Sequence, residues 1–382
     1  MYGLGIDVGS YEIKGVVFDF KKDKVVDFLK IKTKGFKKGN ITSKKDFNEV
    51  LKNVIDNFEN NLDTIFRKCV TGFCSDNFST RFQKDFIFIN HEKVREEDME
   101  RLENYPKRGN LPANRSIVDF YPLAWFLDGV EIQDPLEKPG YKLELASLII
   151  DGFTPFIDDF KNIFTKFFDE DFKIKFPPLS SSLFFLEEEE KNIGTLFVDI
   201  GHETTSLILF YENKCLGIKV IPIGGYNLTK DLAIGLKINI DTAEEIKHKY
   251  GTFGSRRISK KEKISNSFGE FSLKQISEIL DSRFEEILDK IEDFLKALGF
   301  SKKIPGGIVL SGGGSKISNI VNFTKEKIKI YTKKNILVNK FFDSTEDDFC
   351  EYANVISMLK LEYSFFEKND LLTKIKKLLG FN

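Results

Sequence analysis

The sequence has few residues that would support disulfides, metal clusters or a membrane span. Its four cysteines include no CxxC pair, and its three histidines are not spaced with them as metal ligands. Charged side chains interrupt the first twenty residues, and no apolar run approaches the roughly 20 residues that a transmembrane helix needs. Basic and acidic residues nearly balance, 58 against 59, so no overall field attracts nucleic acid. We therefore predict a cytoplasmic protein that binds no nucleic acid.

The length of the chain predicts more than one lobe. It has 382 residues, whereas a single hydrophobic core rarely extends beyond roughly 250–300 residues. Its 41% hydrophobic and 31% charged residues are ordinary for a folded globular protein. We expect at least two folded lobes and no extended disorder.

Two similar strand–turn–strand patterns occur about half the chain apart. Residues 3–8 and 13–20 are rich in β-branched and aromatic residues and flank a polar turn, followed by a strand over 24–31 and a helix over 46–66. The second half repeats this order with strands over 195–200, 206–211 and 214–222 and a helix beginning near Gly225. We interpret this as an internal repeat of the fold, although the two sequences differ.

Further elements complete the pattern. Apolar residues at helical spacing predict helices over 272–298 and 317–329, on either side of a strand over 307–310 and a turn with three glycines. Residues 85–168 lie between the two halves and predict an inserted α+β unit, with a helix over 95–103, a middle part interrupted by Pro and Gly, and a strand over 142–150.

The two polar turns have the composition of phosphate-binding turns. A strand that ends in an Asp-x-Gly turn exposes backbone N–H groups to phosphate oxygens, and its Asp can orient the waters of Mg²⁺. A single turn of this kind is equally an ordinary β-turn, but two facing turns can hold one polyphosphate. The candidate phosphate ligands are Asp7, Gly9, Ser10, Tyr11, Lys14, Gly201, His202, Glu203, Thr204 and Thr205, with Asp7 and Asp199 as the candidate Mg²⁺ residues.

A third group of residues is suited to a nucleoside. Glycines at 312–314 remove side chains where a base and ribose could approach the backbone. Glu244 and Lys247 lie one turn apart on a predicted helix, either as cleft residues or as a solvent-exposed ion pair. The candidate adenosine-binding residues are Gly225, Glu244, Lys247, Gly312, Gly313, Gly314 and Ser315.

These ordered motifs resemble the actin-like ATPase superfamily and, within it, the FtsA family of bacterial division proteins. The resemblance rests on residues 219–236, 243–251 and 307–315, and on residues 94–98, 115–122 and 128–129 of the inserted unit. It implies an α/β, two-lobed actin-like fold with a duplicated β-β-β-α-β-α core. It divides the chain into a first lobe over 1–84, completed by about 169–176 and 345–362; the inserted unit over 85–168; a second lobe over 177–225 and 296–344; a small subdomain over 226–295; a linker over 363–370; and a terminal helix over 371–382.

The chain departs from the family pattern at the second turn. Where the family has further glycines and an Asp, this sequence has His202, Glu203 and Ser206. His202 and Glu203 must avoid positive φ or accept strain of about 1 kcal/mol each, and a carboxylate beside phosphate is unfavourable. Pro177 stands where hydrolysing relatives carry a water-orienting Glu or Gln. We therefore expect ATP hydrolysis to be slow at most.

The last residues predict an amphipathic helix. Leu371, Leu372, Ile375, Leu378 and Leu379 fall on one helical face, and Lys374, Lys376 and Lys377 take the remainder. Such a helix either packs on the body of the protein or binds an anionic membrane surface, and the resemblance to FtsA favours the membrane.

The resemblance implies a protein that binds ATP and Mg²⁺, polymerises into actin-like protofilaments and anchors FtsZ at the membrane of the division site. It also implies that the inserted unit contacts other division proteins. The candidate residues for the acidic FtsZ tail are Arg256, Arg257, Lys260, Lys261, Lys274 and Arg283. The alternatives are a PilM-like adaptor of pilus or secretion assembly, which would lack the terminal helix, and a sugar or acetate kinase, for which we find no catalytic Asp motif.

Overall fold

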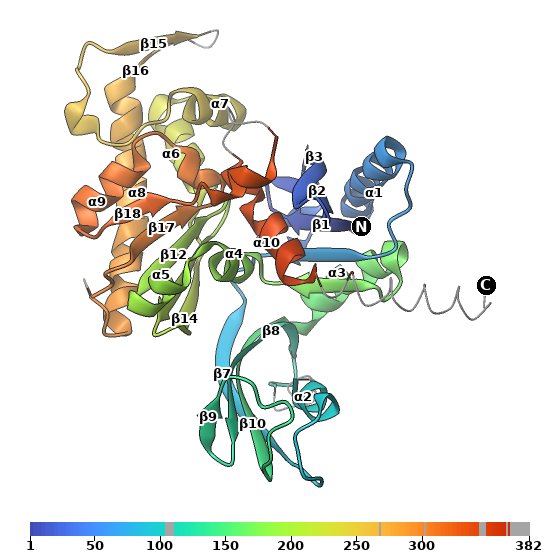
Figure 1. Cartoon of the computed structure of the whole chain (residues 1–382). Coiled ribbons are helices and arrows are strands. Elements are labelled where there is room, and N and C mark those ends of the chain that lie inside the picture. The colour runs from blue at the N-terminus through green and yellow to red at the C-terminus, as the bar shows by residue number, and fades with distance from the viewer. Residues whose placement is uncertain (104–110, 267–268, 302, 344–348, 364–365, 367–382) are drawn as a thin grey trace.

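The computed structural model describes residues 1–103, 111–266, 269–301, 303–343, 349–363 and 366. It contains two α/β lobes side by side, and a β-rich unit extends away from them (Figure 1). The predicted two-lobed α/β architecture with an inserted α+β unit is therefore confirmed.

The first lobe is built on a five-stranded sheet in the order β11-β6-β1-β2-β3. Helices α1 and α3 pack on one face of the sheet, and α10 packs on the other. The elements are β1 Tyr2–Val8, β2 Glu12–Asp19, β3 Lys24–Lys32, the short pair β4 Phe36–Lys37 and β5 Asn40–Ile41, α1 Lys44–Leu62, β6 Cys69–Phe73, α3 Thr154–Phe168, β11 Phe172–Lys175 and α10 Ala353–Leu361.

The second lobe repeats this topology in a sheet ordered β14-β13-β12-β17-β18. In each sheet the central strand, β1 or β12, is antiparallel to the next strand and parallel to a later one, β6 or β17. The predicted internal repeat is thus present as strand order. The elements are α4 Pro177–Phe185, α5 Glu188–Ile193, β12 Thr195–Ile200, β13 Thr205–Tyr211, β14 Lys214–Ile221, α6 Gly225–Leu236, α7 Ile240–Tyr250, β15 Lys263–Asn266, β16 Gly269–Ser272, α8 Leu273–Ala297, β17 Gly307–Ser311, α9 Ile320–Ile328 and β18 Thr332–Lys334.

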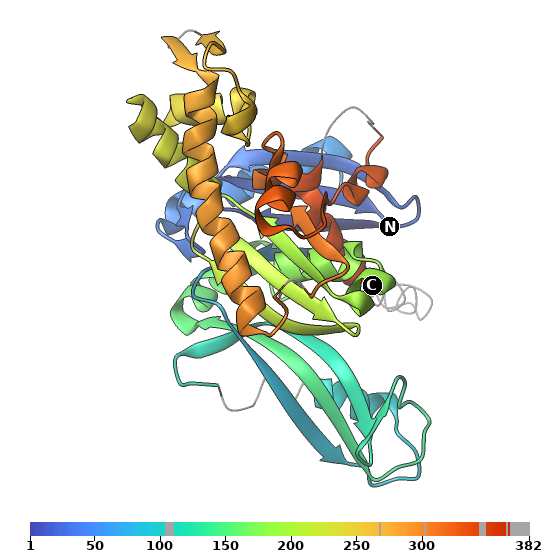
Figure 2. The same ribbon diagram turned by 90° about the vertical axis from the view of Figure 1, so that its left-hand side faces the viewer.

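The long helix α8 runs along the second lobe and reaches the β15–β16 pair at the far end (Figure 2). Its apolar face, which includes Ile276, Leu280 and Phe284, is buried against α6, α9 and the sheet. Between the lobes, α4 packs on both α10 and β13. Side chains of β12 and β13 therefore share a hydrophobic core with the first lobe.

The inserted unit is an antiparallel sheet in the order β7-β10-β8-β9 with one helix. Its own core is formed by Ile87, Val94, Leu102, Leu127 and Leu143 among others. Its elements are β7 Ser79–Phe88, α2 Glu96–Glu103, β8 Arg115–Leu127, β9 Val130–Ile132 and β10 Lys142–Phe153. Because the sheet covers residues 79–153 and α3 belongs to the core of the first lobe, we propose these bounds for the unit in place of 85–168.

The first long helix is shorter than predicted. It ends at Leu62, because Asp63 adopts a left-handed conformation, with φ +46°, and its N–H caps the carbonyl of Glu59. Ile65, which fits the helical spacing, is 76% exposed. The predicted extension to residue 66 is wrong because the apolar period continues beyond the turn that ends the helix.

The predicted terminal helix, residues 371–382, lies outside the described residues, together with its candidate membrane residues Leu371, Leu372, Lys374, Ile375, Lys376, Lys377, Leu378 and Leu379. In the part of the chain that the structure describes, no helix combines the length and apolarity required to cross a bilayer.

Candidate functional site

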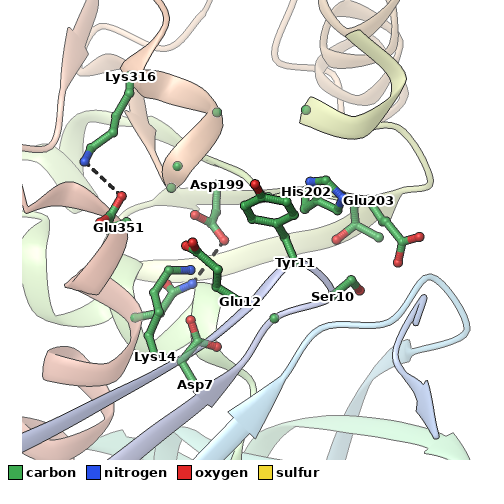
Figure 3. Close-up of a pocket in the computed structure, with 18 of the residues that line it drawn as sticks. Asp7, Ser10, Tyr11, Glu12, Lys14, Asp199, His202, Glu203, Lys316 and Glu351 are labelled. Carbon is green, nitrogen blue, oxygen red and sulfur yellow. Dashed lines mark hydrogen bonds and ion pairs between the residues drawn. The ribbon is translucent and has the colours of Figure 1, made fainter. Parts of the chain in front are cut away.

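A cavity of about 320 Å³ lies between the lobes, where the two polar turns and the glycine turn meet (Figure 3). It brings together residues that are as far apart in the sequence as Asp7 and Asn354. The predicted site residues that line it are Asp7, Gly9, Ser10, Tyr11, Lys14, Asp199, Gly201, His202, Glu203, Thr204, Gly225, Glu244, Lys247, Gly312, Gly313 and Gly314.

The first turn joins β1 to β2 and is held by Thr33. The Thr33 hydroxyl donates to the carbonyl of Gly9 at 2.7 Å, and the Thr33 N–H donates to the carbonyl of Tyr11 at 2.9 Å. A Cβ atom on Gly9 would lie 2.7 Å from the carbonyl oxygen of Glu12, so the tight turn requires glycine. Lys14 pairs with Asp7 across the hairpin, so both side chains belong to the cavity wall.

The second turn joins β12 to β13 without the strain that its sequence suggests. Neither His202 nor Glu203 has a positive φ, and the N–H of Gly201 closes the turn on the carbonyl of Thr204 at 2.8 Å. The Glu203 carboxylate points away from Asp7 and Asp199 (Figure 3) and accepts a hydrogen bond from the backbone N–H of Lys38 at 2.6 Å. The turn therefore accommodates Glu203 by directing its carboxylate to the first lobe, away from the two aspartates.

Two buried carboxylates face the cavity from the two lobes. Burial raises the pKa of Asp199 to about 6 and also raises that of Asp7, although Lys14 and Asn354 oppose the change. Asp199 Oδ2 accepts from the Asn354 amide at 3.3 Å, whereas buried Oδ1 has no hydrogen-bond partner among the described residues. An orphaned carboxylate oxygen beside a second carboxylate suits a hydrated divalent cation such as Mg²⁺. The described residues contain no group of three or more potential ligands, so water and phosphate would have to complete such a site.

Glu244 and Lys247 form a buried pair on α7, which replaces the solvent-exposed alternative. The Lys247 ammonium donates to Glu244 at 2.7 Å, to the Thr229 hydroxyl at 2.8 Å and to the carbonyl of Gly225 at 3.2 Å. Burial opposes ionisation of Glu244, but hydrogen bonds from His248 and Lys247 lower its pKa to about 2. A fixed ion pair at this wall can present polar groups to a ribose.

The glycine turn after β17 is shaped by contact with Asp199. Gly312 has φ +80°, and a Cβ there would lie 2.4 Å from Asp199 Oδ1. Two predicted residues lie behind the cavity wall. The Ser315 hydroxyl donates to the Gly312 carbonyl at 2.7 Å, and the Thr205 hydroxyl donates to the Ile223 carbonyl at 2.8 Å. Both residues are fully buried, and the hydrogen bonds of their hydroxyls to backbone carbonyls stabilise the turns.

Sequence reasoning missed several residues of the cavity. Glu351 accepts from Lys30 of β3 and from Lys316 after the glycine turn, each at 2.8 Å. Burial opposes ionisation of Glu351, yet these two ammonium groups lower its pKa. Lys316 follows the glycine turn directly and could have been found from that motif. Lys30, Glu351 and Asn354 carry no local signal, because only the packing of β3, α10 and the short helical turn before α10 (Cys350–Tyr352) brings them to the cleft.

The basic residues predicted for a partner lie on the small subdomain. They differ in whether their side chains form ion pairs within the protein and in how exposed they are. Arg283 binds Asp231 at 2.6 Å and also pairs with Glu286, and Arg257 pairs with Glu326. Lys274 is half-buried on α8, whereas Arg256, Lys260 and Lys261 are exposed. The exposed three are the better candidates for an acidic ligand.

We expect His202 to make the protein acid-labile. Burial lowers the pKa of His202 from 6.5 to about 4, so between these pH values the unfolded chain binds a proton that the folded chain does not. Stability due to the neutral ring is complete above pH 6.5 and is lost as the pH falls to 4. Against His202→Phe, the wild-type unfolding free energy should fall by up to about 3 kcal/mol over this range. Urea titrations from pH 7 to 4 measure it, and parallel curves for the two proteins would contradict it.

Comparisons with known proteins agree with this geometry. The family model described as Cell division protein FtsA matches residues 196–354. The Cell division protein FtsA of Bacillus subtilis (strain 168) is 25% identical over 337 residues, covering 85% of this chain and 76% of that protein. Many further proteins match, and several of these are also FtsA.

Solved structures support the fold. A PilM-PilN type IV pilus biogenesis complex superposes with a TM-score of 0.67 at 17% identity, covering 94% of this chain and 97% of that one. MreB5 of Spiroplasma citri bound to AMPPNP gives a TM-score of 0.56 at 14% identity, covering 97% of this chain and 98% of that one. The chain is therefore similar in sequence to the FtsA family of cell division proteins, and it has an actin-like fold.

Proposed function

We propose that the chain binds ATP with Mg²⁺ in the interlobe cleft, polymerises into actin-like protofilaments and anchors FtsZ filaments to the inner face of the cell membrane at the division site. The observation that carries the nucleotide part is the convergence of two strand–turn–strand hairpins and a glycine turn on one cavity. Similarity to the Cell division protein FtsA family supports the cellular role.

In this proposal the backbone N–H groups of the two turns hold the phosphates, with Lys14 as a point charge. Asp7 and Asp199 orient the hydrated Mg²⁺, and the glycine turn receives the nucleoside. Pro177 lines the cavity and has no group that could orient an attacking water, so hydrolysis is slow and nucleotide acts mainly by binding and not by turnover.

The proposed partner surfaces lie away from the cleft. Arg256, Lys260 and Lys261 are exposed on the small subdomain and suit the acidic FtsZ tail. The inserted unit offers Phe82, Phe86 and Phe88, exposed along its edge strand β7, to other division proteins. The five aliphatic residues and three lysines of the terminal segment suit an anionic bilayer. One such segment binds reversibly, and a filament would make binding stable through avidity.

Deletion of residues 371–382 tests the anchoring role. The truncated protein should bind Mg-ATP and FtsZ as before, yet fail to float with anionic liposomes or to bring FtsZ with it, because it lacks the apolar face. A variant with Lys374, Lys376 and Lys377 changed to Gln keeps that face and should show weaker, salt-insensitive flotation. Flotation of the truncated protein at the full-length level would contradict the anchor, and full-length protein that does not cosediment with FtsZ would favour the pilus-assembly alternative.

A further inference from the structure

The second polar turn makes a direct bond to the first lobe. Glu203 is only 8% exposed, and its carboxylate accepts from the backbone N–H of Lys38 at 2.6 Å. Lys38 is at the tip of the β4–β5 pair, with φ +50°, and its carbonyl accepts from the Ser75 hydroxyl at 3.2 Å. The carboxylate therefore binds a backbone group that the first lobe holds in place, and a charged acceptor makes a strong hydrogen bond.

An aromatic contact lies beside this bond. The His202 ring is 4.7 Å from the ring of Tyr11 in the first turn and 5.1 Å from the ring of Tyr226 at the start of α6, between centroids. Figure 3 shows Tyr11 reaching from its turn to His202. The N–H of Tyr226 also donates to the carbonyl of His202 at 2.7 Å. The ring of His202 thus links the first lobe to the helix that begins the small subdomain.

A third contact involves the thiol of Cys74, just after β6. Its sulfur lies 3.3 Å from the Ser206 hydroxyl and 3.6 Å from the Thr204 hydroxyl. These three interlobe contacts are made by His202, Glu203, Thr204 and Ser206, four of the five residues 202–206. The residues that replace the glycines of the family turn are the ones that supply the first two.

We propose that His202 and Glu203 form an interlobe clasp that holds the cleft closed before nucleotide binds. This inference rests on the proposed nucleotide site and names its regulation. A ligand shifts a conformational equilibrium only through its different affinity for the two states. In a protein already closed by its own side chains, nucleotide enters a preformed cleft and changes the lobe arrangement little. Assembly of such a protein responds weakly to nucleotide, and removal of the clasp makes it nucleotide-dependent.

Hydrogen exchange at the Lys38 amide tests the clasp in the full-length protein. In nucleotide-free wild type this amide should exchange slowly, and Glu203→Ala should accelerate it by about tenfold or more, because a hydrogen bond to a charged acceptor is lost. Mg-ATP should slow the exchange in the variant and have little effect on wild type. Glu292→Ala, at an exposed site on α8, is the matched control and should leave exchange unchanged. Fast exchange in nucleotide-free wild type that slows only with Mg-ATP would overturn the clasp.

A cross-link provides a second readout that retains Glu203. Ser206→Cys places a thiol beside native Cys74, and diamide should join the two in nucleotide-free protein. The same cross-link should form several-fold more slowly when Glu203→Ala is added, and Mg-ATP should restore its rate. Cross-linking of Ser206→Cys that requires Mg-ATP would refute a preclosed cleft. Calorimetry with Mg-ATP is independent of both tests, so absence of nucleotide binding would refute the proposed site while leaving the nucleotide-free results to decide the clasp.

Discussion

Replacing Gly312 by alanine should remove nucleotide binding from the cleft. Gly312 has φ +80°, a backbone conformation that residues with a side chain rarely adopt. A Cβ atom there would lie 2.4 Å from Asp199 Oδ1 and 2.6 Å from the Ile200 carbonyl oxygen. Neither neighbour can move freely, because Asp199 is buried and Ile200 ends the central strand β12. The substitution must therefore displace the carboxylate proposed to orient Mg²⁺ or the glycine turn itself.

We expect Gly312→Ala to weaken Mg-ATP binding by about 100-fold or more and to lower the unfolding free energy by about 2–4 kcal/mol, from backbone strain together with the clash. Calorimetric titration and urea unfolding measure the two effects. Gly313→Ala is the matched control, because it lies in the same turn, has no positive φ and would place its Cβ in open space. Unfolding of Gly313→Ala should resemble wild type within about 0.5 kcal/mol. Wild-type affinity in Gly312→Ala would show that the glycine turn does not shape a nucleotide site.

The parts of this site that could be predicted from sequence are those whose structure is local. A strand that ends at Asp7 and returns after a glycine forms a hairpin from its own pattern, and so does the copy at Asp199. Because the two copies take equivalent places in two sheets of the same topology, their meeting follows from the repeat. The glycines at 312–314 are placed by the parallel pairing of β12 with β17.

The direction of the Glu203 side chain could not be predicted, because it depends on a contact with Lys38, 165 residues away. From the sequence we expected backbone strain at His202 and Glu203, which replace glycines, and repulsion between the Glu203 carboxylate and phosphate. In the structure neither residue has a positive φ, and the Glu203 carboxylate faces the other lobe. The position of the Asn354 side chain could not be predicted from the local sequence either. Its place beside Asp199 depends on how α10 packs under the first lobe, and nothing in the neighbouring sequence indicates it.

The joint of the inserted unit is stabilised by a buried ion cluster around Asp151, at the end of β10. Asp151 is fully buried. Its carboxylate accepts from Arg81 of β7, with an Nη2–Oδ2 distance of 2.7 Å, and from Arg115 of β8. Arg115 also donates to the carbonyl of Asn77 at 3.0 Å. Three strands of the unit are thereby fixed to one another where they leave the first lobe.

Asp151→Ala should destabilise the protein by about 3–5 kcal/mol, because it leaves two partly buried guanidinium groups without a counter-charge. The single tryptophan, Trp125 on β8, reports on the unit, so fluorescence should record its unfolding at lower urea than the far-UV circular dichroism of the whole chain. Glu131→Ala is the control: it removes an exposed pair with Lys214, 3.2 Å apart, and should cost no more than about 1 kcal/mol. Coincident transitions in Asp151→Ala with a loss below about 1 kcal/mol would mean that hydrophobic packing, and not this cluster, fixes the joint.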